Sequence, residues 1–152
     1  DFEIITIDNA SSDETPNLCE SYGKSLFGNN FQYLRQEENR NFSGANNIGA
    51  KIANGKYLFL LNNDTIAQKN WYNPLISALK NSTNIGAVGP LLLYPKDNTN
   101  IMRVQHAGVT LSLDNQVSHI YELFPPNHHA VQNDHDFQVI TGAALMIEKN
   151  LY

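Results

Sequence analysis

Apolar and polar positions in the first two thirds of the chain follow two periodicities, one typical of strands and one of helices. The segment 3–7 (EIITI) is rich in β-branched residues, 57–61 (YLFLL) is wholly apolar, and 31–34 is a shorter candidate, so each predicts a strand. Apolar residues at helical spacing predict helices over 15–23, 45–53 and 72–79. Alternating strands and helices predict an α/β fold, with a mainly parallel sheet covered by helices on both faces.

The first predicted helix carries start and stop signals of its own. Thr15 suits the N-cap, and Pro16 fits the first helical position. Gly23 suits a C-terminal stop, as does Gly55 after the second predicted helix. The helix should bury an apolar face made by Leu18, Cys19 and Tyr22.

The pattern changes from residue 94 onward. The segment 85–93 is apolar, and strand candidates at 104–113 and 138–147 flank a polar stretch rich in Asn, His and Pro. The loop from His128 to Asp136 lacks the spacing of an HExxH motif or of paired cysteines, so a solvated loop is favoured over a metal site. Its possible ligands are His128, His129, Asp134, His135 and Asp136.

Length and composition narrow the class of protein. A chain of 152 residues suits one domain, and its 41% hydrophobic content is enough for a core. The net charge of -5 argues against a nucleic-acid binder. The single cysteine, Cys19, excludes an intrachain disulfide and fits a reducing compartment. No apolar run reaches the roughly 20 residues of a membrane span, and the first residues lack a signal-peptide pattern.

Two of the predicted strands end in acidic, polar turns. Asp8 and Asn9 follow 3–7, and Asn62-Asn63-Asp64 follows 57–61. If both strands are parallel, these turns meet at the carboxyl edge of the sheet, where open α/β sheets bind ligands. Each aspartate taken alone is better explained as a helix cap. The two turns together favour a site in which Asp8 and Asp64 face one crevice.

Carboxylates at such an edge suit Mg²⁺ or Mn²⁺, which proteins often hold together with substrate phosphates. A phosphorylated ligand is therefore expected. The sequence has no GxxxxGK[ST] loop, and no GxGxxG follows the first strand. The small residues of 44–49 (GANNIG) are explained by close packing of a helix on the sheet.

Five segments, taken in order, resemble the motifs of family 2 glycosyltransferases. Residues 8–13 (DNASSD) resemble the nucleotide-recognition turn, and 41–49 (NFSGANNIG) the next motif. Residues 57–65 (YLFLLNNDT) resemble the DXD strand, in the Asn-Xaa-Asp form of rhamnosyltransferase-like members. Residues 105–108 (QHAG) and 141–147 (TGAALMI) are similar to two later landmarks. The resemblance spans nearly the whole chain and implies a three-layer α/β/α GT-A (nucleotide-diphospho-sugar transferase) fold.

The resemblance implies an enzyme that transfers a hexose or deoxyhexose from a nucleotide-diphospho-sugar to a hydroxyl of a glycan or lipid-linked acceptor. The reaction would be inverting, would depend on Mg²⁺ or Mn²⁺, and would serve glycan or polysaccharide synthesis in the cytoplasm, with peripheral contact at the inner face of the membrane. Asp64 would hold the metal, and Thr141 and Gly142 would border the sugar and acceptor. The donor nucleotide would be bound by Asp8, Asn9, Ser11, Asn46, Asn47, Asn62 and Asn63.

The sequence departs from the family pattern in three places. Asn62 replaces one DXD carboxylate, the family's first strand is missing before Asp1, and the expected catalytic base lies beyond Tyr152. We therefore expect a single partial domain over 1–152, truncated at both ends and inactive alone. Residues 1–93 would form the donor-binding half and 94–152 the start of the acceptor-side half.

Other interpretations of the whole chain and of single residues stay open. A nucleotidyltransferase would show a Gly-rich or basic phosphate loop near its start, and a non-catalytic nucleotide-sugar-binding module would lack the acidic pair after Met146. His106 could approach the donor diphosphate, although an isolated His in this position is more often structural. Trp71 is expected to anchor a helix by packing.

Overall fold

The computed structural model describes residues 1–96 and 100–152, which form two compact units. The first unit comprises Asp1–Leu58 and Glu148–Tyr152, and the second comprises Phe59–Ile147. These bounds differ from the donor-binding half at 1–93 and the acceptor-side half at 94–152, of which residues 97–99 lie outside the described residues. The assignment of those halves stays a prediction.

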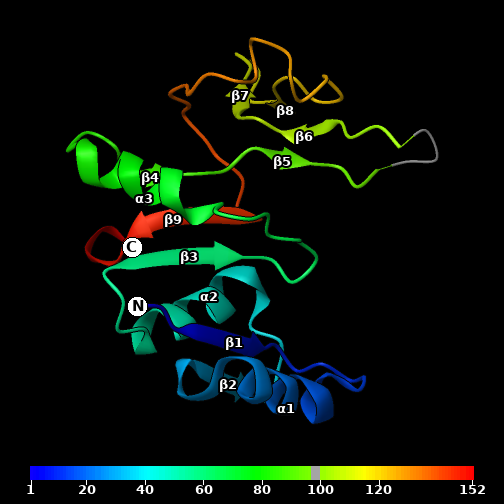
Figure 1. Cartoon of the computed structure of the whole chain (residues 1–152), viewed down its shortest axis with the longest axis vertical. Helices are drawn as coiled ribbons and strands as arrows, with labels where there is room; N and C mark the ends of the chain where they lie inside the picture. Colours follow the sequence, from blue (N-terminus) through cyan, green and yellow to red (C-terminus); the bar gives the residue numbers. More distant parts are fainter. Residues whose placement is uncertain (97–99) are drawn as a thin grey trace. The chain divides into compact units, whose positions relative to one another are not determined.

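The first unit is built on two parallel strands. β1 (Ile4–Asp8) pairs with β2 (Phe31–Arg35), with Ile4 opposite Phe31 and Asp8 opposite Arg35. The helix α1 (Thr15–Phe27) and the 3-10 turn η1 (Gly28–Asn30) connect these strands, and α2 (Asn41–Ile52) follows β2. A second 3-10 turn, η2 (Lys149–Leu151), also belongs to this unit. Figure 1 shows the arrows of β1 and β2 with α1 and α2 beside them.

The strand register explains why the two helices lie on opposite faces of this pair. Successive side chains of a strand point to alternate faces, so Phe31 shares a face with Ile4, and Ile7 lies on the other face. The buried Phe31 packs against Gly23 of α1. Gly49 of α2 lies over Ile7, where an added Cβ would be 3.4 Å from Cγ1 of Ile7. The three-layer α/β/α arrangement follows, with small residues at the helix–sheet contact as expected.

The structure corrects the signals assigned to α1. The N-cap is Glu14 instead of Thr15, and Asp13 Oδ1 accepts a hydrogen bond from the Thr15 backbone N–H at 2.9 Å. Pro16 lies in the first turn, as expected. Gly23 does not end the helix, which continues to Phe27. Gly23 instead lies against the Phe31 ring, where a side chain would clash. The expected apolar face is also wrong, since Leu18 and Tyr22 are 48% and 64% exposed.

The remaining strands lie in the second unit, except that Tyr57 and Leu58 of β3 and Glu148 of β9 belong to the first. A three-stranded sheet has the order β3–β9–β4, from β3 (Tyr57–Leu61), β9 (Ala144–Glu148) and β4 (Ala87–Val88), and β9 is antiparallel to β4. Figure 1 shows the arrow of β9 opposite in direction to that of β3. The helix α3 (Tyr72–Asn81) contacts β4. The pair β1 and β2 in the first unit is therefore parallel, as expected. The pair β4 and β9 is antiparallel, because β9 comes from the end of the chain and lies between β3 and β4.

Two further antiparallel pairs complete the second unit. β5 (Leu92–Leu93) pairs with β6 (Val104–His106), and β7 (Val109–Leu111) pairs with β8 (Val117–His119). The core of this unit includes Val104, which is fully buried, and several neighbours that are almost so: Leu75, Val109, Ala144 and Met146. Within residues 1–96 and 100–152, no helix combines the length and apolar character that a bilayer crossing requires.

Three sequence expectations about the second unit have clear outcomes. The strand expected over 138–147 begins only at Ala144, because Thr141 donates its backbone N–H to a histidine side chain instead of a neighbouring strand. β8 lies in the polar stretch, where no strand was expected. Trp71 is a packing residue, as expected, with its ring centroid 4.2 Å from that of Phe59.

Candidate functional site

The carboxyl ends of β1 and β2 carry a buried, charged cluster built on Asp8. The Asp8 side chain is fully buried, and its Oδ1 accepts a hydrogen bond from the Ser11 backbone N–H at 2.8 Å. Its Oδ2 accepts from the Tyr33 hydroxyl at 2.5 Å and from Nη1 of Arg35 at 3.0 Å. Arg35 also donates from Nη2 to the Ser11 backbone oxygen at 2.9 Å. The cluster therefore fixes both the carboxylate and the turn that follows it.

This environment keeps Asp8 ionised. Burial by itself would raise the pKa of Asp8, but the hydrogen bonds from Ser11 and Tyr33 and the charge of Arg35 outweigh it, and the pKa is lowered from 3.8. Burial, together with the hydrogen bond to Asp8, raises the pKa of the Tyr33 hydroxyl. At neutral pH the site thus holds a desolvated carboxylate beside a protonated phenol and a guanidinium.

Asn9 connects the end of β1 to the start of α2. Its Oδ1 accepts from the Arg40 backbone N–H at 2.7 Å, and its Nδ2 donates to Asn39 Oδ1 at 2.8 Å and to the Asn41 backbone oxygen at 3.3 Å. The side chain of Asn9 therefore holds the loop that precedes α2, next to the turn that contains Ser11.

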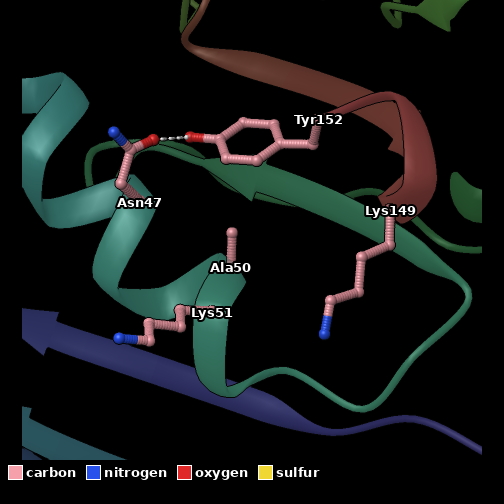
Figure 2. Close-up of a pocket in the computed structure, with 5 residues that line it drawn as sticks. All are labelled: Asn47, Ala50, Lys51, Lys149 and Tyr152. Atoms are coloured by element: carbon pink, nitrogen blue, oxygen red, sulfur yellow. Dashed lines mark hydrogen bonds between the residues drawn. The ribbon is translucent and has the colours of Figure 1, made fainter.

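Asn46 and Asn47 lie on α2. Asn46 Nδ2 donates to the Phe42 backbone oxygen at 2.9 Å, within the helix, and Asn47 Oδ1 accepts from the Tyr152 hydroxyl at 2.8 Å. Figure 2 shows Asn47 and Tyr152 facing each other. They line a pocket of about 360 Å³ together with Ala50, Lys51 and Lys149. The Lys149 ammonium is engaged there, since it donates to the Ala53 backbone oxygen after the last turn of α2.

The turn after β3 belongs to the second unit. Asn63 and Asp64 are exposed, and Asn62 is half-buried. The Asn62 backbone N–H donates to the Ala143 oxygen at 2.9 Å, and the Asn62 oxygen accepts from the Thr65 hydroxyl at 2.7 Å. The backbone of the turn is thus fixed on both sides, while the Asp64 carboxylate faces solvent.

Thr141 and Gly142 lie beside that turn, because the next residue, Ala143, accepts a hydrogen bond from the Asn62 backbone N–H. The Ala143 backbone N–H donates to Thr141 Oγ1 at 3.2 Å, and the Thr141 N–H donates to His106 Nε2 at 3.4 Å. His106 is 3% exposed, and its Nδ1 lies 3.0 Å from Nδ1 of His119. Burial, and then the nearby His119, lowers the pKa of His106 to about 4, so His106 is neutral at physiological pH.

The structure thus brings the predicted site residues together in two groups. In the first unit, Asp8, Asn9 and Ser11 share one turn, and Asn9 ties it to α2, which carries Asn46 and Asn47. In the second unit, the turn 62–64 is joined by a hydrogen bond to Ala143, which directly follows Thr141 and Gly142. Asp8 and Asp64 belong to different units, so their common crevice stays a prediction.

The family model described as glycosyl transferase family 2 matches residues 1–149 of the chain. The chain belongs to this family. The family expected from the sequence is therefore confirmed, whereas the rhamnosyltransferase-like branch stays a prediction.

Two curated proteins and a solved structure are similar to this family 2 chain. Protein y4gI of Sinorhizobium fredii is 27% identical over 158 residues, which cover 99% of this chain and 16% of y4gI. The O-antigen biosynthesis protein RfbC of Myxococcus xanthus is 28% identical over 118 residues, which cover 74% of this chain and 9% of RfbC. The crystal structure of GalNAc-T7 with UDP, GalNAc and Mn²⁺ is 20% identical, with a TM-score of 0.74 over 98% of this chain and 29% of that one.

The likeness to the solved structure shows the fold, and the likeness to the two curated relatives shows how small a part of each relative this chain matches. The likeness to GalNAc-T7 shows that the family 2 chain has the GT-A fold, as expected. The chain spans 16% and 9% of the length of the two curated relatives. The activity, substrates and partners of the whole protein are therefore proposals.

The residues of the turn 62–64 fit a hard divalent cation by their chemistry. Asp64 offers an exposed carboxylate, and Asn62 and Asn63 offer amide oxygens, the type of ligand that Mg²⁺ and Mn²⁺ take in proteins. Among the described residues, no three His, Cys, Asp or Glu side chains gather around one point, the loop at 128–136 included. Within the part of the chain that the structure describes, the turn therefore offers such an ion one carboxylate and two amide oxygens.

Tyr33 and Arg35 complete the cluster around Asp8, although neither was expected from the sequence. A usable signal was present in the strand pattern. Phe31, Tyr33 and Arg35 alternate along β2 and stand opposite Ile4, Thr6 and Asp8 in the parallel register. Aligning two parallel strands by their apolar starts places Arg35 beside Asp8, since both strands point to the same edge.

Proposed function

We propose that the protein is a metal-dependent glycosyltransferase that moves a sugar from a nucleotide-diphospho-sugar to a hydroxyl acceptor, with inversion, in glycan or polysaccharide synthesis. Family membership supports the reaction class. RfbC is named for O-antigen biosynthesis, and GalNAc-T7 was solved with UDP, GalNAc and Mn²⁺, which support a nucleotide donor, a glycan product and a divalent cation. A cytoplasmic location at the inner face of the membrane belongs to the proposal, and rests on the reducing compartment that a lone cysteine fits.

The observation that carries the proposal is the buried, ionised carboxylate at the carboxyl end of β1. A desolvated carboxylate in a fixed position is a strong acceptor for the N–H edge of a pyrimidine base. Oδ1 of Asp8 accepts one hydrogen bond, from Ser11, and a carboxylate oxygen can accept two. Oδ1 of Asp8 therefore keeps one lone pair for a base, while Tyr33 and Arg35 hold its other oxygen. Because the side chain is fully buried, the turn around Ser11 would have to move for a base to reach it.

The remaining roles follow the family motif. Asn62 and Asn63 would line the ribose side, and Asn46 and Asn47 would support the nucleotide. Thr141 and Gly142 would border the sugar and the acceptor. Asp64 would hold Mg²⁺ or Mn²⁺, which, when bound, offsets the charge that grows on the departing diphosphate. Because Asp64 is the only carboxylate in 62–64, the diphosphate must supply further ligands to that ion.

Two variants of the full-length protein test the proposal. Activity would be measured by nucleotide diphosphate release over a panel of UDP-, dTDP- and GDP-sugars, with and without Mn²⁺, and the product anomer would be read by NMR. Asp64→Asn should lower kcat by about 100-fold or more with an intact fold, because an amide cannot offset the developing charge. Asp8→Asn should mainly raise the KM for the donor, because its partner is the base, away from the reacting bond.

The split between the two variants decides the assignment. Near-normal turnover of Asp64→Asn with Mn²⁺ present would exclude the metal role of this residue. Calorimetry supplies an independent check: Mn²⁺ alone should bind poorly, and should bind clearly once UDP is added. Full-length protein that releases no nucleotide from any donor would instead favour a non-catalytic binding module.

A further inference from the structure

An unbroken series of hydrogen bonds connects a buried histidine to the turn that carries Asp64. His106 Nε2 accepts from the Thr141 backbone N–H, and Thr141 Oγ1 accepts from the Ala143 N–H. The Ala143 oxygen then accepts from the Asn62 N–H at 2.9 Å. All of these residues belong to the second unit, and His106 enters the series from β6.

The geometry determines which nitrogen of His106 carries the proton. A backbone N–H can only donate, so Nε2 of His106 must be the unprotonated acceptor for Thr141. In a neutral ring the proton then lies on Nδ1, which donates to Nδ1 of His119 at 3.0 Å. His119 of β8 therefore selects the tautomer that His106 needs in order to hold Thr141.

A close approach at Gly108, between β6 and β7, fixes the same segment. Gly108 has φ +136°, and a Cβ added there would lie 2.5 Å from the ring of Phe137. Val139 forms a bridge with Val109 of β7. The chain between Phe137 and Ala143 is thus held against β6 and β7 by packing, and the bond from Thr141 to His106 sets how it meets the turn at Asn62.

We propose that His106 is a positioning residue for the sugar and metal side of the site, acting through Thr141 and Ala143 on the backbone of the turn 62–64. The inference rests on the proposed function, which gives these two segments their roles. The Asp64 carboxylate is exposed and has no bond of its own within the described residues that fixes it, so its location depends on the backbone of the turn. Because His106 lies on β6 and contacts His119 of β8, the position of that backbone depends on both strands.

Two substitutions of similar size separate the two nitrogens of the ring. In His106→Gln, the side-chain oxygen can stand near the Nε2 position and accept from Thr141. In His106→Asn, the amide nitrogen can stand near the Nδ1 position and donate to His119, but nothing accepts from Thr141. The exposed His129, outside this series, supplies the matched control His129→Asn.

Amide hydrogen exchange, read by NMR on the full-length protein, tests the proposal without any substrate. In His106→Asn, exchange of the Ala143 and Asn62 amides should speed up by about tenfold, the effect expected from losing one buried hydrogen bond. In His106→Gln and His129→Asn these rates should stay within about threefold of wild type. Equal rates in the Asn and Gln variants of His106, or an unchanged Asn62 amide in His106→Asn, would overturn the proposal.

A second measurement needs no variant and therefore does not depend on folding of His106→Asn. Imidazole ¹⁵N shifts of the wild-type protein at neutral pH should show His106 as the Nδ1–H tautomer, and an Nε2–H tautomer would overturn the proposal. With the donor that turns over fastest in the panel, His106→Asn should lower kcat with little change in KM, and His106→Gln should restore it. Failure of every donor would overturn the proposed function, whereas the exchange result stands without it.

Discussion

Asp8→Asn is a sharp test of the buried cluster, because it removes one charge and leaves the shape nearly unchanged. Oδ1 of the new amide can still accept from the Ser11 N–H. The group that replaces Oδ2 is an NH₂, so it can no longer accept from Tyr33 or Arg35. The Tyr33 hydroxyl can rotate and accept instead, whereas the Arg35 guanidinium has only donors.

The magnitude follows from where the two charged groups lie. Losing one member of a fully buried ion pair costs about 3–5 kcal/mol. The Arg35 side chain is 44% exposed, however, and keeps its bond to the Ser11 oxygen, so water can replace the lost partner. We therefore expect Asp8→Asn to lower the free energy of unfolding at pH 7 by about 2 kcal/mol, within the range for hydrogen bonds to a charged group.

The dependence on pH gives the test its sign. The pKa of Asp8 is lowered from 3.8 in the folded protein, so the stabilisation by the carboxylate is fully present above 3.8 and is lost as pH falls through the folded pKa. Urea unfolding of both proteins should show a constant difference from pH 7 to about pH 5, which shrinks only below the pKa of the unfolded chain.

One control and one outcome complete this experiment. Asp64→Asn makes the same chemical change at an exposed carboxylate and should alter the free energy of unfolding by less than about 0.5 kcal/mol. A difference between wild type and Asp8→Asn that grows as pH falls from about 7 to about 5 would mean that burial raises the pKa of Asp8. The cluster would then not hold an ionised carboxylate.

Two further predictions concern the same unit. Tyr33→Phe removes a hydrogen bond that lowers the pKa of Asp8, so that pKa should rise, and ¹³C NMR titration of the Asp8 carboxyl checks it; an unchanged or lower pKa would contradict the contact. Gly23→Ala adds a Cβ that would lie 2.1 Å from the Phe31 ring, so it should destabilise by about 1–3 kcal/mol although alanine favours helices by about 1 kcal/mol. Urea unfolding beside Gly86→Ala, where an added Cβ meets open space, checks it, and a stabilised Gly23→Ala would contradict the packing.

The sequence by itself determined the elements whose signal is local. The strand at 57–61 has the predicted bounds, and the helix predicted over 72–79 ends two residues later, at Asn81. Both depend on side-chain periodicity within one short segment, which a single chain displays directly. The family could also be identified, since its ordered motifs are local features of the chain. The roles of the individual motif residues stay predictions.

The tertiary structure decided what depends on residues distant in sequence. Gly23 looks like a helix stop until Phe31, on the next strand, is placed beneath it. Asp8 has partners 25 and 27 residues away, and His106 meets Thr141 across 35 residues. Strand register and the pairing of buried polar groups are properties of the packed chain, because each buried donor or acceptor must find a partner among whatever the fold brings near it. No periodicity within one segment contains that information, which is why the anchors of the candidate site became visible only in three dimensions.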